Sequence, residues 1–317
     1  MSVALLFSPQ GSQSVGMGRD IADRWGAAAD VYAVADQALG WSVTSTCWEG
    51  PEERLNDTRQ TQPCLVATCL AALAALREEI ELRPAFVAGH SVGEYAALVA
   101  AGALELADAL RLVARRGQLM AEAAPDGGMS AVIGLDRAAV ADAVATTGVG
   151  GDLVVANDNA PGQVVVSGTR AALDAAAAAL QAAGARRVIP LKVSGPFHSP
   201  MMASVGDALA RAFEAVAWRD ADPAVVSNVT GEPVREATEI RSLLARQVSS
   251  PVEWVRSVRS MVTAGVDTFV EIGPGAALTG MVRRIAPGAR TMNVADAEGL
   301  GATAGALAAP AEASARP

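Results

Sequence analysis

A chain of 317 residues with 51% hydrophobic content is long enough to bury a substantial core in one large domain or two smaller ones. Its formal net charge of −9 argues against a nucleic-acid-binding surface, which needs an excess of lysine and arginine to neutralise phosphates. Because the sequence has no apolar run of the roughly 18 residues that a membrane span needs, and no basic leader segment before the first apolar stretch, we expect a cytoplasmic globular protein.

The N-terminal part of the sequence alternates apolar strand segments with helical segments. The predicted elements are strands over 3–7 and 85–88 and helices over 62–80, 95–101 and 107–124. The helix over 62–80 is expected to begin after Pro63, since proline is favoured at the start of a helix. Alternating β and α elements predict a mostly parallel sheet covered by helices.

Residues 89–94 read Gly-His-Ser-Val-Gly-Glu, at the junction between the second strand and its helix. The Gly-x-Ser-x-Gly pattern is typical of a nucleophile elbow, a sharp strand-to-helix turn that exposes a serine hydroxyl. We expect Gly89 and Gly93 to permit the turn and Ser91 to be the nucleophile. The amide of Val92, at the start of the helix, would then point toward a developing oxyanion. The same five residues can also form an ordinary tight turn. The evidence for a nucleophile elbow therefore comes from the strand predicted before them and the helix predicted after them.

Between residues 128 and 193 the order of predicted elements changes. It runs strand 129–134, helix 137–147, strand 153–157, strand 163–168, helix 169–183 and strand 187–193. This is the β-α-β-β-α-β order of ferredoxin-like domains, within about 65 residues. We therefore predict a hydrolase-like α/β core formed by 1–127 and 194–296, interrupted by a small ferredoxin-like subdomain over 128–193.

After the insert, helices and strands alternate again, with strands expected over 224–229 and 268–271. Beyond residue 296 the sequence consists mainly of alanine, glycine and proline. We expect residues 297–317 to form a flexible tail.

An activated serine needs a base within hydrogen-bond reach, most often a histidine, and this chain has two. His90 directly precedes Ser91, and neighbouring side chains leave an elbow on different sides, so we favour a buried structural role for His90. His198 lies in a turn at the exit of the insert, and we predict that it acts as general base and later as general acid. No acidic residue stands out as its partner, but a backbone carbonyl can hold the imidazole Nδ1–H instead.

Short motifs that occur together in one known family are spread along the chain. They are Pro9-Gln-Gly-Ser-Gln13, Gln62-Pro63, Gly89-His-Ser-Val-Gly-Glu-Tyr95, Arg115-Arg-Gly-Gln118, Gly195-Pro-Phe-His-Ser199, Gln247 before Pro251-Val252, and Glu271-Ile-Gly-Pro-Gly275. With them, the sequence from Phe7 to about Ile285 resembles the malonyl-CoA:acyl carrier protein transacylases of fatty acid synthesis and the related acyltransferases of polyketide synthesis. The fold of that family, a hydrolase-like core interrupted by a ferredoxin-like subdomain, agrees with the order of elements read above.

The resemblance implies a two-step acyl transfer from malonyl-CoA to the phosphopantetheine thiol of an acyl carrier protein. In this scheme Ser91 carries the malonyl group as an ester and His198 is its base. The backbone carbonyl of Gln247 orients His198, and the amides of Gln10 and Val92 form the oxyanion hole.

The resemblance also assigns the residues that select the acyl group. Arg116 would pair with the free carboxylate of the malonyl group, and its planar guanidinium suits bidentate recognition. Phe197 and Val92 match the malonyl-type pattern, and a ring beside the pocket disfavours a 2-methyl branch. Gln62 is expected to line the pocket. Two of these residues also have simpler interpretations. Phe197 could pack in the hydrophobic core, and Arg116 could be a solvated charge on the surface of a helix.

The carrier protein is strongly acidic in this family, which predicts basic residues near the mouth of the site. The candidates are Arg186, Arg187 and Lys192 on the insert and Arg283 and Arg284 in the core, although solvated surface charge explains each of them equally well. The scheme requires no metal and no cofactor bound by this chain, because the partner carries the phosphopantetheine. The three cysteines, Cys47, Cys64 and Cys69, have no metal-ligand spacing and are expected to be reduced and mostly buried.

Several functions remain compatible with these observations. The elbow and its histidine alone also permit a serine esterase or thioesterase. Within the resemblance, the chain can serve fatty acid synthesis, act in trans on a polyketide synthase, or be the malonyltransferase of a malonate decarboxylase system. A non-catalytic carrier-protein docking module is disfavoured, because Ser91, His198 and Arg116 are all present.

Overall fold

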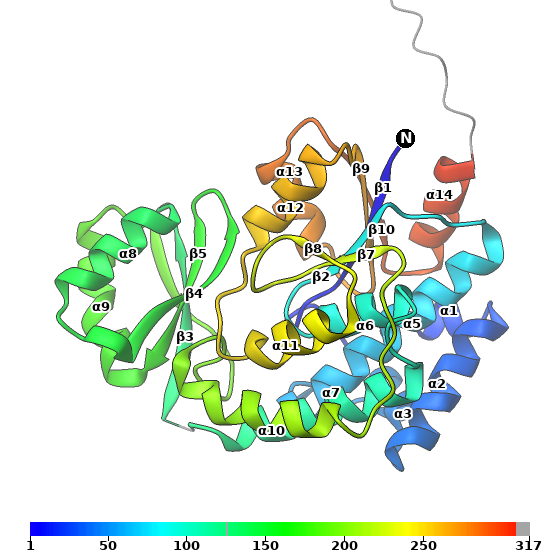
Figure 1. The fold of residues 1–317 in the computed structure, drawn as a ribbon, viewed down its shortest axis with the longest axis horizontal. Helices are drawn as coiled ribbons and strands as arrows, with labels where there is room; N and C mark the ends of the chain where they lie inside the picture. The colour runs from blue at the N-terminus through cyan, green and yellow to red at the C-terminus, as the bar shows by residue number, and fades with distance from the viewer. Residues whose placement is uncertain (125, 309–317) are drawn as a thin grey trace, which may run out of the picture.

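The structure is a computed structural model that describes residues 1–124 and 126–308. Its strands are β1 Val3–Phe7, β2 Phe86–Gly89, β3 Gly127–Ile133, β4 Leu153–Ala160, β5 Gln163–Thr169, β6 Arg187–Pro190, β7 Ala224–Val226, β8 Pro233–Val234, β9 Thr268–Ile272 and β10 Arg290–Val294. Its α-helices are α1 Arg19–Ala22, α2 Gly26–Leu39, α3 Val43–Trp48, α4 Glu52–Leu55, α5 Thr58–Glu79, α6 Gly93–Ala100, α7 Leu106–Glu122, α8 Arg137–Thr146, α9 Arg170–Ala182, α10 Ala203–Phe213, α11 Ala237–Gln247, α12 Trp254–Thr263, α13 Ala277–Ile285 and α14 Ala297–Ala308. The elements form two units, with the smaller one, from β3 to β6, lying beside the larger (Figure 1).

The larger unit is built on a six-stranded sheet in the order β10-β9-β1-β2-β7-β8, parallel except where β8 pairs with β7. Successive side chains of a strand point to opposite faces, and both faces of this sheet are covered. In β1, Leu5 and Phe7 pack into the core shared with α2, α5 and α7, whereas Ala4 and Leu6 pack with α12 and α13. The predicted α/β core with a mostly parallel sheet is confirmed.

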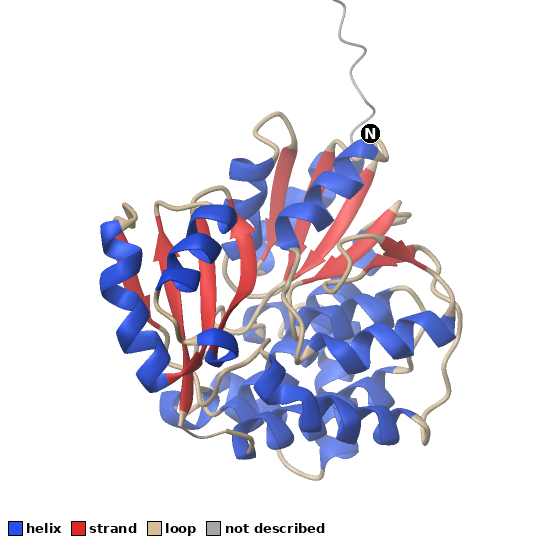
Figure 2. Cartoon of the chain, turned by 60° about the vertical axis from the view of Figure 1, so that its left-hand side comes forward, coloured by secondary structure: helices blue, strands red, loops and turns tan. Residues whose placement is uncertain are grey.

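The smaller unit is an antiparallel sheet in the order β4-β5-β3-β6, with α8 and α9 on one face. Val132, Val164 and Val166 point toward those helices. Met129 and Val165, on the opposite face, belong to the core of the larger unit. The predicted β-α-β-β-α-β order is therefore present, and the inserted sheet packs against the core through its second face (Figure 2).

Backbone hydrogen bonds also join the inserted sheet to the segment after α11. Val252 donates its amide to the carbonyl of Ala156 at 2.8 Å and accepts from the amide of Asp158 at 3.0 Å. This is a parallel bridge between Asn157 and Val252 at the edge strand β4 of the inserted sheet. The segment that follows Gln247 is thus held in place by a strand nearly 100 residues earlier in the chain.

Two sequence expectations are corrected. The helix expected to begin after Pro63 begins at Thr58, because the Asp57 side chain caps it by accepting from the amide of Arg59 at 2.9 Å, and Pro63 lies inside the helix. Residues 297–308 form helix α14 rather than a flexible tail.

The α14 helix is held in place by packing and by a hydrogen bond at its first residue. Leu300 is fully buried, and the amide of Ala297 donates to Asp20 of α1 at 2.7 Å. The remaining part of the predicted tail, residues 309–317, lies outside the described residues. Among the helices of residues 1–124 and 126–308, none combines the length and apolar character that a membrane crossing requires.

Candidate active site

The turn between β2 and α6 places Ser91 at the carboxyl end of the central sheet. A side chain at Gly89 would collide with the backbone of Gly93, and one at Gly93 would collide with the carbonyl of Phe7. Both positions therefore need glycine because neighbouring backbone leaves no room for a side chain. The residue with the left-handed backbone conformation is Ser91 itself, with φ 52°. A non-glycine residue held in this region is typical of a nucleophile elbow.

His198 lies next to Ser91 although 107 residues separate them in the chain, and its Nε2 is 2.8 Å from Ser91 Oγ. On its other side Nδ1 is 2.9 Å from the carbonyl of Gln247 and 3.2 Å from that of Ser250. Two carbonyl acceptors require that Nδ1 carries the proton, which leaves Nε2 free to accept the Ser91 hydroxyl. Burial, followed by the positive charge of Arg116, lowers the pKa of His198 to about 3, so its imidazole is neutral at pH 7.

His90, the other histidine, is bonded to the inserted sheet. Its Nε2 is 2.8 Å from Asn159 Oδ1 on β4, and its ring lies 5.4 Å from that of Trp254. Burial lowers the pKa of His90 to about 4, so this ring is also neutral. These contacts give His90 a packing role between the elbow, β4 and α12, as expected from its position in the motif.

Arg116 is 1% exposed and reaches Ser91 from the buried face of α7. Its Nη2 donates to Ser91 Oγ and to Gln247 Oε1, each at 3.0 Å, and its Nη1 donates to Gln62 Oε1 at 2.6 Å. Burial lowers the pKa of Arg116, while nearby Tyr95 and Glu94 oppose this shift. Within the described part of the chain, every acceptor that contacts this cation directly is neutral, and its Nε has no partner.

Two residues that the sequence did not single out complete the polar network. Asn228 accepts the amide of Ser91 at 2.6 Å and donates Nδ2 to the carbonyl of Gly89 at 2.7 Å, which fixes the elbow from the β7 side. Glu94 accepts from the Gln247 side chain at 2.6 Å and from the amide of Asn228 at 3.2 Å. Glu94 could have been found from the sequence, because it directly follows the elbow and belongs to the family motif Gly89-His-Ser-Val-Gly-Glu-Tyr95, whereas no pattern in the sequence points to Asn228.

The two amides expected to form an oxyanion hole lie on adjacent strand ends. Gln10 follows β1 and Val92 follows β2, and the last residues of these strands, Phe7 and Gly89, are paired in register. Val92 is buried at the first turn of α6, and the Gln10 side chain donates to Thr58 Oγ1 at 3.2 Å. Among the described residues, neither backbone amide donates to a protein acceptor, so both are available to a ligand.

The other predicted residues fall into two groups. Gln62 is fully buried on α5 and contacts Arg116, and Phe197 is 5% exposed and packs in the main core. The basic candidates are exposed at two separate places, along β6 and on α13: Arg186, Arg187, Lys192, Arg283 and Arg284. Arg284 is tied to the β4–β5 hairpin, because its Nη1 donates to Gln163 Oε1 at 2.9 Å.

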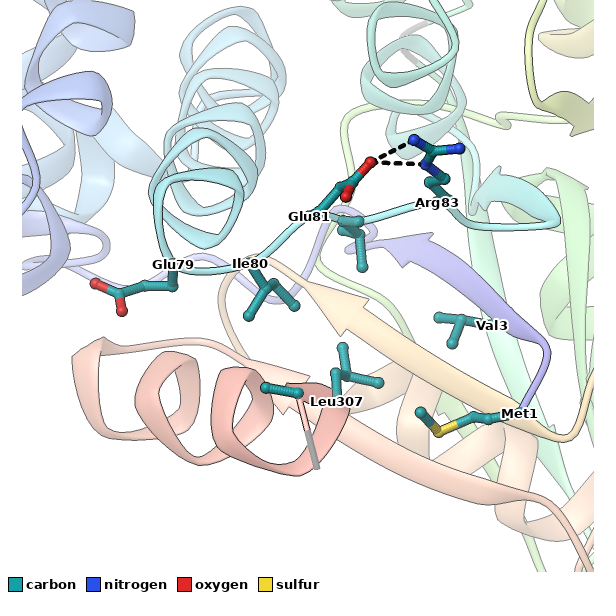
Figure 3. A pocket seen from close by; sticks show the side chains of 9 residues that line it. Met1, Val3, Glu79, Ile80, Glu81, Arg83 and Leu307 are labelled. Atoms are coloured by element: carbon teal, nitrogen blue, oxygen red, sulfur yellow. Dashed lines mark hydrogen bonds and ion pairs between the residues drawn. The ribbon is translucent and has the colours of Figure 1, made fainter. Parts of the chain in front are cut away.

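Two further features lie apart from this site. A surface cavity of about 500 Å³ is lined by the start of β1, the loop after α5 and the end of α14 (Figure 3). It contains none of the residues described above. Among the described residues, no cluster of three histidine, cysteine or carboxylate side chains has the arrangement of a metal site.

The chain matches a family of known enzymes over nearly its whole length. The family model described as the acyl transferase domain matches residues 4–303. The malonyl CoA-acyl carrier protein transacylase of Bacillus subtilis (strain 168) is 40% identical over 299 residues, which cover 93% of this chain and 94% of that protein. The protein of the same name from Escherichia coli (strain K12) is 42% identical over 284 residues, covering 89% and 92%.

Solved structures agree with these sequence matches. The malonyl CoA-acyl carrier protein transacylase of Coxiella burnetii superimposes with a TM-score of 0.94 at 33% identity, covering 97% of this chain and 98% of that one. A malonyl-transacylase solved in complex with a type II PKS acyl-carrier protein gives a TM-score of 0.93 at 37% identity, covering 96% and 100%.

Proposed function

Since the chain belongs to the acyl transferase domain family, we propose that it transfers a malonyl group from malonyl-CoA to the phosphopantetheine thiol of an acyl carrier protein. The observation that carries this proposal is Arg116, a buried cation that contacts Ser91 Oγ and has only neutral partners. A buried guanidinium is stabilised by an anion, and the malonyl group brings a carboxylate two carbons from the thioester carbonyl that Ser91 attacks. An ordinary esterase or thioesterase has no need of this charge.

In the first half-reaction, Ser91 Oγ attacks the thioester carbonyl while its proton passes to His198 Nε2. The Gln247 carbonyl holds the other nitrogen of the ring in the required tautomer. The amides of Gln10 and Val92 stabilise the oxyanion of the tetrahedral intermediate. When the intermediate collapses, the C–S bond breaks, His198 returns the proton to the sulfur of CoA, and the malonyl ester remains on Ser91.

Binding of the malonyl carboxylate also changes the contacts of Ser91. In the structure Nη2 of Arg116 donates to Ser91 Oγ, the atom that must attack. A carboxylate that takes this donor releases the hydroxyl, and it neutralises the charge that helps to lower the pKa of His198. A malonyl substrate thus improves both the nucleophile and its base, and an acetyl substrate does neither.

In the second half-reaction, the carrier thiol attacks the malonyl ester, with His198 as base, and free Ser91 is regenerated. The complex of a similar malonyl-transacylase with its carrier protein supports this acceptor. We assign the exposed basic residues along β6 to contact with the acidic carrier, because that strand leads directly to the His198 turn. The same reaction serves fatty acid or polyketide synthesis.

The proposal requires no metal and no cofactor bound by this chain, since general base catalysis and the oxyanion amides supply the chemistry. We place the reaction in the cytoplasm. The three cysteines support this location, because they are buried and unpaired, as expected for a reducing compartment.

Incubation with malonyl-CoA labelled in the malonyl group tests the function. We expect a stable label on Ser91 that moves to the thiol of holo acyl carrier protein when the carrier is added. Rapid release of free malonate without carrier would indicate a hydrolase instead, and turnover by a Ser91→Ala variant equal to that of the unaltered protein would exclude the serine mechanism.

A further inference from the structure

None of the steps above uses Glu94, a carboxylate that is 4% exposed in the first turn of α6. Its Oε2 accepts from Gln247 Nε2 at 2.6 Å and from the amide of Asn228 at 3.2 Å. A buried carboxylate is costly unless hydrogen bonds and a nearby cation compensate for the lost hydration. The N-terminus of α6 also favours its ionised form.

The side chain of Gln247 connects Glu94 to Arg116. Its Nε2 donates to Glu94, and its Oε1 accepts from Arg116 Nη2 at 3.0 Å. Because an ionised carboxylate can only accept hydrogen bonds, Glu94 fixes the amide with its oxygen toward Arg116. A buried anion and a buried cation are therefore separated by one amide, and their charges cancel while the pocket is empty.

Few groups near Glu94 can change charge. Those that face it are Arg116 from α7 and Tyr95 from its own helix, while Gln247 and Asn228 contribute neutral amides from α11 and from the segment after β7. Burial raises the pKa of Glu94 to about 7, against the opposing effects of Gln247, Asn228 and Arg116. Burial also raises the pKa of Tyr95 far above its ordinary value, so the phenol stays neutral. Glu94 is thus the group in this network that can take up a proton near neutral pH.

A malonyl carboxylate bound to Arg116 adds a third charge to the network. Two carboxylates beside one guanidinium leave a buried site with a net negative charge, and like charges that share a site favour protonation of one of them. The substrate carboxylate contacts Arg116 directly, whereas Glu94 is one amide further away, so the proton goes to Glu94. Glu94 Oε2 already accepts from Gln247 Nε2 and from the amide of Asn228, so the added proton is placed on Oε1, and the Gln247 amide keeps its bonds to Glu94 and to the carbonyl of Ser91.

On the basis of the malonyl function above, we propose that Glu94 is a proton-linked counter-charge of Arg116: above neutral pH it is ionised when the pocket is empty and protonated while a malonyl group is bound. One proton enters from solvent when the malonyl carboxylate binds, and it leaves when the acyl group departs on the carrier thiol. Glu94 contacts neither the substrate nor the reacting atoms, so it is a positioning residue. An acetyl group has no carboxylate and causes no proton uptake.

Calorimetric binding of malonyl-CoA to a Ser91→Ala variant tests this proposal, because acylation is then absent. Titrations at about pH 8 in buffers of different ionisation enthalpy give the number of protons taken up. We expect about one proton for malonyl-CoA and about none for acetyl-CoA. In a Ser91→Ala, Glu94→Gln double variant, malonyl-CoA should still bind, but without proton uptake. The matched control combines Ser91→Ala with Glu122→Gln, at an exposed glutamate, and should leave the proton uptake unchanged.

A second measurement requires no substitution at Glu94. In the Ser91→Ala protein, the affinity for malonyl-CoA relative to acetyl-CoA should be constant below about pH 7, where Glu94 is already protonated, and should fall up to about tenfold per pH unit above it. Taking the ratio of the two affinities cancels any pH effect that malonyl-CoA and acetyl-CoA share.

The outcomes separate this inference from the function on which it rests. If malonyl-CoA binds more tightly than acetyl-CoA but without proton uptake or pH dependence, the role of Glu94 is refuted and the malonyl function stands. Uptake that persists in the double variant assigns the proton to another group and also refutes it. If Ser91→Ala binds both thioesters equally, the malonyl site at Arg116 and the role of Glu94 fall together.

Discussion

Replacing Arg116 with alanine should separate recognition of the malonyl carboxylate from the acyl-transfer chemistry at Ser91. In the empty site, this guanidinium donates to Ser91 Oγ at 3.0 Å and to Gln62 at 2.6 Å, and its positive charge contributes to the lowered pKa of His198. Its removal deletes the partner of the malonyl carboxylate. It also frees the nucleophile and removes a charge that opposes protonation of the base.

The two substrates should therefore respond in opposite directions. Loss of one partner of a buried charge pair costs about 2–5 kcal/mol, which lowers kcat/KM for malonyl-CoA by about 30-fold to several thousand-fold. For acetyl-CoA, release of the Arg116 to Ser91 hydrogen bond is worth about 0.5–1.5 kcal/mol, so kcat/KM should be unchanged or rise by up to about tenfold.

The assay measures transfer of labelled malonyl and acetyl groups to holo acyl carrier protein by the unaltered chain and by two variants. Arg115→Ala is the matched control, since Arg115 is exposed on the same helix and donates to Gln118 at 3.0 Å. It should leave both rates within about twofold, as expected for an exposed charge. Thermal unfolding establishes whether Arg116→Ala remains folded. Equal losses on both substrates in the folded variant would refute the assignment of Arg116 to the malonyl carboxylate.

Other predictions concern the base, the elbow and the pocket. His198→Ala should reduce acylation of Ser91 by about 10²–10⁴-fold, whereas His90→Ala should mainly lower the melting temperature; the reverse result in a labelling assay would exchange their roles. Because the pKa of His198 is lowered to about 3, its imidazole stays neutral in mild acid, and kcat/KM for acetyl-CoA should be level from about pH 7 to about pH 5; a loss centred near the ordinary histidine pKa would contradict this. Gly89→Ala should prevent folding because its side chain meets the Gly93 backbone, while Gly26→Ala, which meets nothing within 4 Å, should not; circular dichroism compares them. Phe197→Ala should reduce the preference for malonyl-CoA over methylmalonyl-CoA by about 1–3 kcal/mol in competition assays, and an unchanged preference would leave this ring a packing role only.

The fold class and the order of most elements could be predicted from the sequence because their signals are local. The alternation of strands and helices predicts the parallel sheet, and the change of order after residue 127 predicts the inserted antiparallel one. The predictions that were wrong concern segments whose structure depends on contacts with distant parts of the chain. The Ala-rich segment 297–308 has the composition of a tail, and it is helical because Leu300 packs into the core and Asp20 binds the first helical amide.

For the candidate site, the sequence limited the chemistry to few residues. The elbow marks Ser91, two histidines leave one plausible base, and motif register marks Arg116. The requirement for glycine at positions 89 and 93 was also predicted, but for another reason. The structure shows that a side chain there has no room, while the unusual backbone angle falls on the serine.

Only the tertiary structure decided what surrounds those residues. The family resemblance implied the Gln247 carbonyl as the acceptor that orients His198, and the fold places it there. Nothing in the sequence pointed to the second acceptor, the carbonyl of Ser250, because every residue has a carbonyl. The link from Glu94 to Arg116 likewise requires the Gln247 side chain, which lies 153 and 131 residues from them in the chain. The sequence by itself determined which groups can react. Their protonation states depend on burial and on distances across the fold, and so only the tertiary structure determined them.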